Sequence, residues 1–437
     1  MKMIQSVTEE KLGLKELVAM GVGGMVGGGI FSVLGLAVGV AGHAAPIAFF
    51  FGAIIALLTG FSYAKLGLVF HSDGGSFTYL EHAFRHRNIA GIGGWLLVAG
   101  YIGTMALYAY TFAVYGTAMF GENTHSNALH HFLQSMILLI FLGINLYGIK
   151  AVGKSEDVIV MVKVFILSLF AIIGLFYVKT DHLLPFFNQG RAGVLMGAAL
   201  IFVAYEGFEL IPNAVREMKN PLRDLPRAIF ISIVITTTIY ILVALVAVGN
   251  LSPSDITRYK EYALAVAAKP FLGKAGFMLI ALAALLSTAS AINATLFGTA
   301  RLAMVMAKDK DLPRVFTHKE RLRDIPWVSL VFITAVTILF VNTGNLTIIS
   351  AFASSTFLLI FASINLSAFR LRRRISIGTK IPLTGLVLTT ASWMVLIVYL
   401  WQTSRQSLMW ICIFYVSVIT AELLFSQRKV LHKEKRN

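Results

Sequence analysis

The chain has 437 residues, of which 57% are hydrophobic and only 13% are charged. Its mean hydropathy is +0.78. A soluble domain carries about 25% charged residues to cover its surface, so this composition excludes a water-soluble globule. The net charge of +16 would suit a nucleic-acid partner, but the basic residues are spread between apolar blocks. Those blocks are long enough to cross a bilayer as helices, which predicts an all-α polytopic membrane protein.

Twelve apolar blocks follow one another, and each predicts one membrane-spanning helix. Residues 1–16 are polar and lack the apolar core and cleavage site of a signal peptide, so we expect a cytoplasmic tail. The predicted spans are Leu17–Ala41, Pro46–Phe70, Ile89–Phe120, Phe132–Ile149, Asp157–Val178, Gly193–Val215, Ala228–Gly249, Ala275–Met306, Ile325–Val341, Leu346–Phe369, Ile381–Trp401 and Leu408–Phe425.

Basic residues alternate between the loops and so predict the orientation. The two tails and the even-numbered loops hold 29 Lys and Arg residues, whereas the odd-numbered loops hold seven. Because basic loops stay in the cytoplasm, both termini are predicted to be cytoplasmic, with the chain in a cell (inner or plasma) membrane. The cluster Arg370, Arg372, Arg373 and Arg374 is then a topology signal beside anionic lipid rather than a nucleic-acid site.

Glycines interrupt the first span. They are Gly21, Gly23, Gly24, Gly27, Gly28 and Gly29. Glycine costs about 1 kcal/mol relative to alanine in a helix interior, so the run 27–29 predicts unwinding near mid-membrane. N–H groups freed at a half-helix N-terminus would attract an anion such as a carboxylate. Close helix packing is the alternative use of small residues, and we favour it for Gly21 and Gly24.

The sixth span carries two carboxylates and a glycine in the sequence FVAYEGFE, residues 202–209. An ionisable residue inside a membrane is costly and indicates a functional site. We expect this of Glu206, whereas Glu209 could instead touch the cytoplasmic interface.

Spans one and six begin two successive units of five helices. Broken helices at matching positions mark the substrate site of inverted-repeat transporters. The sequence therefore predicts a five-plus-five inverted-repeat core at 17–369, a basic loop at 370–380, two C-terminal spans at 381–425 and a basic tail at 426–437.

Four short motifs carry a family resemblance. GGGIF (27–31) is similar to a G-[SA]-x-I-F segment, with Gly28 where Ser or Ala is usual, and AYEGFE (204–209) lies on the sixth span. LYGIKAVGKSE (146–156) joins spans four and five, and MAKDKDLP (306–313) follows span eight. In their order along the chain the motifs resemble the amino acid–polyamine–organocation (APC) transporters, in particular prokaryotic proton-coupled amino acid permeases. The resemblance runs from Leu12 to about Pro313 and is weaker beyond.

The resemblance implies a permease that moves amino acids by proton symport with alternating access, without enzymatic activity or a cofactor. The substrate carboxylate would meet N–H groups of Gly28 and Gly29, and its ammonium would meet carbonyls of the broken sixth span. The substrate-binding residues so assigned are Gly27, Gly28, Gly29, Phe202, Ala204, Tyr205 and Glu206. An amino acid or polyamine exchanger without net proton coupling, a sodium-coupled carrier and a channel-like uniporter are the alternatives.

Lys163 lies alone in the apolar run VIVMVKVFILSLF of the fifth span. The resemblance implies that a lysine at this place replaces the cation that sodium-coupled relatives hold between spans one, five and eight. Desolvation disfavours the charged ammonium, so Lys163 would gain and lose the coupling proton. Gly23, Glu209 and the eighth-span hydroxyl groups of Ser287, Thr288 and Ser290 are its supporting candidates. Snorkelling of the side chain to the interface is the alternative.

Other chemistry has little support in the sequence. No HExxH motif, GxSxG motif or aspartate pair occurs within the spans, which argues against an intramembrane enzyme. The single cysteine, Cys412, excludes a disulfide framework or a cysteine-based metal site. His43, His125, His130 and His131 are expected to face solvent in outer loops without metal-ligand spacing. We expect a monomer or a homodimer.

Overall fold

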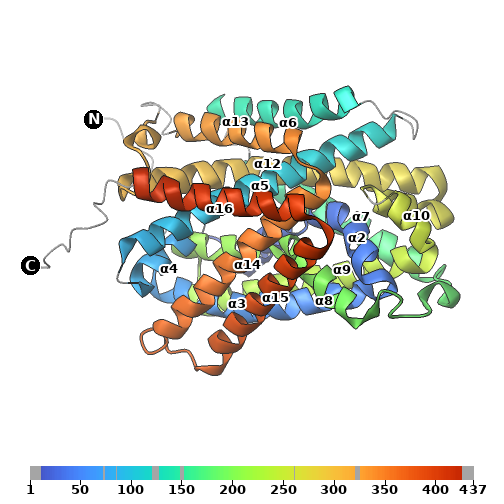
Figure 1. Cartoon of the computed structure of the whole chain (residues 1–437), viewed down its shortest axis with the longest axis horizontal. Helices are drawn as coiled ribbons and strands as arrows, with labels where there is room; N and C mark the ends of the chain where they lie inside the picture. The colour runs from blue at the N-terminus through green and yellow to red at the C-terminus, as the bar shows by residue number, and fades with distance from the viewer. Residues whose placement is uncertain are drawn as a thin grey trace, which may run out of the picture.

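The computed structural model describes residues 11–71, 74–84, 86–120, 127–147, 152–259, 261–319 and 325–425. These residues form helices and one isolated parallel bridge, between Leu12 and Met218. The helices pack into one elongated bundle, in which α14 and α15 run obliquely to α5, α12 and α16 (Figure 1).

Ten of the predicted spans each correspond to a single helix. These helices are α3 (Ala45–Val69), α5 (Arg87–Met119), α6 (Asn127–Tyr147), α7 (Val152–Leu175), α9 (Pro221–Asn250), α12 (Lys269–Lys308), α13 (Trp327–Thr343), α14 (Leu346–Arg370), α15 (Lys380–Thr403) and α16 (Arg405–Phe425). The helix of the eighth span, α12, has non-helical backbone angles at Gly273, before that span begins.

The other two spans are broken. The first consists of α1 (Leu14–Met25) and α2 (Gly29–Ala41). The sixth consists of α8 (Gly190–Leu200) and two 3₁₀ segments, η3 (Phe202–Tyr205) and η4 (Phe208–Glu217). The α8 axis and its 3₁₀ continuation are bent by 51°.

The number of spans depends on how these pieces are grouped. Nine segments of the described residues are long and apolar enough to cross a membrane, and the bent pair makes a tenth. One of the nine, Gly29–Val69, holds both α2 and α3, and α13 is a shorter apolar helix of 17 residues. Counting α2 and α3 apart and including α13 gives twelve. The predicted all-α polytopic membrane fold is confirmed.

Short helices cap the bundle at its two ends. α4 (Ser76–Ala83) lies at one end of the bundle and α10 (Pro253–Arg258) at the other (Figure 1). α11 (Ala263–Ala267) follows α10, and all five of its residues are buried. Three 3₁₀ turns complete the fold: η1 (Gly42–Ala44), η2 (Thr180–Leu183) and η5 (Arg314–Thr317). None of these short helices is among the predicted spans, since each is too short to span a membrane.

Burial separates the inner helices from the outer ones. α2 is buried along most of its length, and α14 has 78% of its apolar window buried. α15 and α16 have only 22% buried, and α6 has 17%. Apolar side chains exposed on these outer helices suit contact with lipid tails, which are as apolar as the side chains themselves. The broken spans therefore lie inside the bundle, shielded by continuous helices.

The expectation for His43 was wrong. Its side chain is only 5% exposed, its N–H donates to Asn188 Oδ1 at 3.0 Å, and its Nδ1 lies 3.1 Å from the carbonyl oxygen of Pro185. The turn η1 is covered by the chain between η2 and α8, so a loop residue became buried beneath another loop. His130 is half-buried on α6 against the Tyr110 ring, His131 is exposed, and His125 lies outside the described residues.

Candidate functional site

The first break leaves three residues, Val26 to Gly28, between the two helices, although Gly28 itself keeps helical backbone angles. Gly28 is the N-cap of α2, and Ser32 makes the first helical hydrogen bond by donating its N–H to the Gly28 carbonyl at 3.0 Å. The preceding N–H groups of a helix have no partner within the helix. Together with the helix dipole they favour an anion. The α2 N-terminus therefore presents backbone donors inside the bundle.

Side chains from two other helices satisfy the carbonyls of this break. Ser287 Oγ on α12 lies 2.7 Å from the Val26 carbonyl oxygen and 2.8 Å from that of Gly27. Lys163 Nζ on α7 donates to the Gly23 carbonyl at 2.7 Å. In a membrane interior an unsatisfied backbone group costs several kcal/mol, so these contacts are what allow the helix to unwind here.

The second break has matching support. Ser354 Oγ on α14 donates to the Leu200 carbonyl at 2.7 Å and accepts the Val203 N–H at 3.0 Å. Ser350 Oγ lies 3.1 Å from the same Leu200 carbonyl. Glu206 is extended, with φ −65° and ψ 141°, and Gly207 has φ +128°, a conformation that favours glycine.

The two breaks touch each other. A Cβ atom on Gly207 would lie 2.5 Å from both Gly24 C and Met25 N. A Cβ atom on Gly29 would lie 2.9 Å from Ala204 Cα. Glycine is therefore required at both crossings, because any side chain would push the two half-helices apart.

Tyr240 of α9 joins the same two segments. Its hydroxyl lies 2.6 Å from the Met25 carbonyl oxygen and 3.0 Å from that of Ala204. The Tyr240 side chain is fully buried, so its hydroxyl has no access to water. One donor thus serves both breaks.

The supporting helices are related by a shift of five spans. α7 and α12, the fifth and eighth spans, serve the first break. α14 and α5, the tenth and third, serve the second, where Thr104 of α5 bonds to Glu206. Adding five to spans five and three gives ten and eight, as a five-plus-five repeat requires.

One face of α5 lies along both breaks. Tyr108 covers the first: a Cβ atom on Gly27 would lie 2.9 Å from the Tyr108 hydroxyl oxygen, and one on Gly28 would collide with the Tyr108 ring. Thr104, one turn earlier, bonds to Glu206 Oε2, and Tyr101 donates to Glu209 Oε1 at 3.5 Å. Residues 101, 104 and 108 recur at helical spacing and so share a face.

Both sixth-span carboxylates are buried. Glu206 is 4% exposed and Glu209 2%, so Glu209 does not lie at an exposed interface. Glu209 Oε2 accepts the Gly207 N–H at 2.7 Å.

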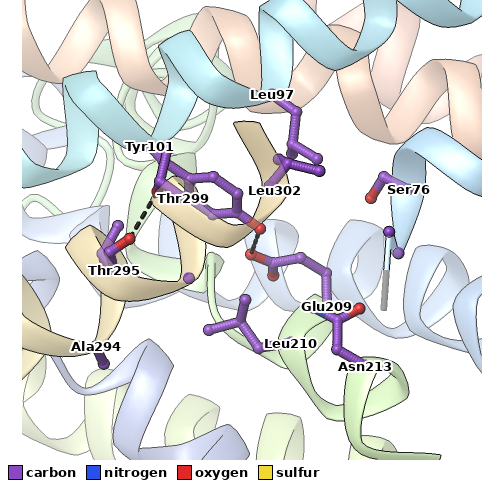
Figure 2. Close-up of a pocket in the computed structure, with 13 residues that line it drawn as sticks. Ser76, Leu97, Tyr101, Glu209, Leu210, Asn213, Ala294, Thr295, Thr299 and Leu302 are labelled. Carbon is purple, nitrogen blue, oxygen red and sulfur yellow. Dashed lines mark hydrogen bonds between the residues drawn. The ribbon is translucent and has the colours of Figure 1, made fainter. Parts of the chain in front are cut away.

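A cavity opens beside Glu209, with about 480 Å³ of empty volume including open solvent. Figure 2 shows the Glu209 side chain directed toward the Tyr101 hydroxyl across this cavity. The lining residues are Gly74, Gly75, Ser76, Leu97, Tyr101, Glu209, Leu210, Asn213, Ala294, Thr295, Gly298, Thr299 and Leu302. The cavity thus joins the α4 end of the bundle to the sixth-span break.

The predicted site residues fall into two groups. The glycine run 27–29, the segment 202–206 and Gly23 meet at the two breaks, with Lys163 and Ser287 bonded to the first. Lys163 is 1% exposed, which argues against snorkelling. Thr288 bonds to Ala284 in its own helix at 2.7 Å, and Ser290 is half-buried on α12. The Ala204 carbonyl, expected to receive an ammonium, already accepts from Tyr240.

Sequence reasoning missed Thr104, Tyr108, Tyr240 and Ser354. Hydroxyl residues are tolerated in membrane helices because they can bond to their own backbone, as Thr111 does to Leu107. The chain has 14 tyrosines, so residue type alone does not single out two of them. The available signal was their place on the third, seventh and tenth spans, which a repeat-based fold brings to the centre.

Two broken helices crossing inside a multi-pass bundle define the site architecture of a secondary transporter. The fold agrees. The solved structure of a mutant manganese transporter of Eremococcus coleocola matches with a TM-score of 0.60 at 12% identity, over 97% of this chain and 95% of that one.

Sequence comparison gives the family. Residues 12–421 match the family model described as amino acid permease. An uncharacterised protein of Methanocaldococcus jannaschii is 35% identical over 96% of both chains. The inner membrane transport protein YbaT of Escherichia coli is 31% identical over 92% of this chain and 93% of its own. The chain belongs to the amino acid permease family, within the APC superfamily.

Proposed function

We propose that this protein takes up amino acids by proton symport through alternating access, with the substrate held between the two broken helices. The observation that carries the proposal is the N-terminus of α2, which presents backbone donors where both breaks meet. A carboxylate is the group that such donors and the helix dipole favour. The chain also belongs to a family of amino acid permeases.

Lys163 is the proposed proton carrier. Its ammonium bonds to the Gly23 carbonyl, one helical turn before the break. Deprotonation removes a charge-assisted hydrogen bond to α1, which loosens α1 from α7. Loss of the proton would thereby permit α1 to move between its two access states. Gly27 to Gly29 would hold the substrate carboxylate, and the carbonyls of Phe202 and Tyr205 would hold its ammonium, since the Ala204 carbonyl already accepts from Tyr240.

The orientation is part of the same proposal. Both termini face the cytoplasm, and the chain resides in the cell membrane as a monomer or homodimer. The cavity beside Glu209 is then cytoplasmic, because α4 lies within the second loop, one of the even-numbered loops. In this arrangement the cavity opens on the cytoplasmic side next to the sixth-span break, at Glu209 and Leu210.

Reconstituted uptake tests the coupling. We expect wild-type proteoliposomes to accumulate amino acids above equilibrium only when the lumen is alkaline relative to the bath. Lys163→Ala leaves a permanently neutral site and Lys163→Arg a permanently charged one, since guanidinium does not deprotonate in proteins. Both variants should fall to the equilibrium level, while the alanine variant still binds substrate.

Lys274→Ala is the matched control, because Lys274 is an exposed lysine on α12. It should accumulate like the wild type. Normal gradient-driven accumulation by Lys163→Ala would show that the proton is carried elsewhere. Wild-type counterflow without any response to the pH gradient would favour the exchanger instead.

A further inference from the structure

Glu206 is a buried carboxylate that the proposed transport cycle does not use. Its side chain is 4% exposed, and its hydrogen bond is with the Thr104 hydroxyl. In the part of the chain that the structure describes, no basic side chain pairs with Glu206. Its electrostatic interaction is instead with Glu209, a second acid. A buried carboxylate is costly to ionise unless a cation compensates it.

The donors around the two acids are unequal. Glu209 receives a backbone N–H at 2.7 Å and the Tyr101 hydroxyl. Among the described residues, Glu206 has only the Thr104 hydroxyl as a side-chain donor, and the single proton of that hydroxyl is also within reach of the Gly100 carbonyl, 3.1 Å from Thr104 Oγ1. A carboxylate has about four acceptor positions. Glu206 therefore keeps acceptor capacity that the protein itself leaves unused.

The place of Glu206 relative to the glycine break follows from α5. Thr104 touches Glu206 and Tyr108 covers Gly27 and Gly28. Four residues of α-helix rise about 6 Å, so Glu206 lies roughly one turn of α5 away from the break. A substrate held by its carboxylate at Gly28 would need a side chain of several methylenes to bring its far end to Glu206.

We infer that Glu206 is a specificity-determining residue that selects amino acids with a cationic side chain. This inference rests on the proposed function, because it places the substrate carboxylate at the α2 N-terminus. The side-chain ammonium or guanidinium supplies the positive charge that Glu206 lacks, and it bonds to the free carboxylate positions. Neutral side chains of the same length leave that carboxylate uncompensated.

Competition for uptake by matched pairs tests the selectivity. Lysine is compared with norleucine, and arginine with citrulline, because each pair is similar in length and differs in charge. We expect the wild type to bind the charged member at least tenfold more tightly. Glu206→Gln should bring both ratios close to one while uptake of norleucine and citrulline persists. Glu422→Gln, at a fully buried carboxylate of α16, should keep the wild-type ratios.

Substrate length gives a second, positional readout. In the series diaminopropionate, diaminobutyrate, ornithine and lysine, wild-type affinity should rise once the side chain reaches Glu206. Glu206→Asp withdraws the carboxylate by one methylene, so its optimum should move to a longer substrate. An unchanged optimum would contradict direct contact. This variant also keeps the test valid if the glutamine variant does not fold.

The outcomes distinguish a failure of this inference from a failure of the proposed function on which it rests. Proton-driven uptake of neutral amino acids with no preference for cationic ones would overturn the role of Glu206 alone. Binding of diamines better than of any amino acid would retain the cation site and refute the carboxylate site. If neither class binds, the proposed function fails, and the selectivity fails with it.

Discussion

At the residue scale, single hydroxyl groups on neighbouring helices hold the unwound segments in place. Ser287 serves the first break and Ser354 the second, and Tyr240 serves both. In each case a side chain replaces the backbone partner that unwinding removes. The same residues therefore contribute both to stability and to function, because they stabilise a half-helix N-terminus inside an apolar bundle.

Removing the Tyr240 hydroxyl tests this role. Tyr240→Phe keeps the ring but leaves the Met25 and Ala204 carbonyls with one donor fewer, in a buried site. An unsatisfied buried acceptor costs about 1–3 kcal/mol, so we expect a lower unfolding midpoint in detergent. Tyr177→Phe, at a tyrosine that is 53% exposed, is the control and should stay near the wild type. Equal midpoints for the two variants would contradict the bridge.

At the scale of elements, the glycines show what sequence can predict. A run of three glycines predicted the first break, and the structure unwinds the chain at 26–28. The acids and Gly207 marked the second. Which residue pairs meet could not be predicted, because Gly24 packs on Gly207 and Gly29 on Ala204 through the tertiary crossing. Close packing, the use we expected for Gly24, is the one found there, and at Gly21 a Cβ atom would lie 2.7 Å from Ser232 Oγ.

Alanine at Gly207 should separate the half-helices. Its Cβ would lie 2.5 Å from two backbone atoms of α1, and φ +128° is strained for any residue with a side chain. We expect the free energy of unfolding to fall by at least about 2 kcal/mol. If the variant does not fold at all, size-exclusion chromatography of the detergent extract should show no folded protein. Gly143→Ala is the matched control: it lies in α6 with no atom within 4 Å of the new Cβ. There alanine should stabilise the helix by up to about 1 kcal/mol. If both variants fold equally well, the crossing is not tight.

At the scale of the whole molecule, hydropathy and charge predicted the class of fold and the order of the spans. The burial of His43 was not predicted, because it depends on one loop packing against a distant segment of the chain. The Glu206 and Glu209 carboxylates were predicted to matter, but their separate environments follow from α5, which approaches them from about 100 residues away in the chain. Long-range contacts of this kind leave no periodic pattern in the sequence.

Orientation is the property of the whole molecule that charge alone predicts. Cys412 is the only native cysteine, so Cys412→Ser gives a background for labelling with a membrane-impermeant maleimide. Lys179→Cys, at an exposed position in the loop after α7, should react in intact cells. Arg314→Cys, exposed after α12, should react only once the membrane is permeabilised, because its loop belongs to the basic set. Both positions are exposed basic residues, so side-chain accessibility does not separate them. The reverse pattern would invert the topology, and the cavity beside Glu209 would then face the outside.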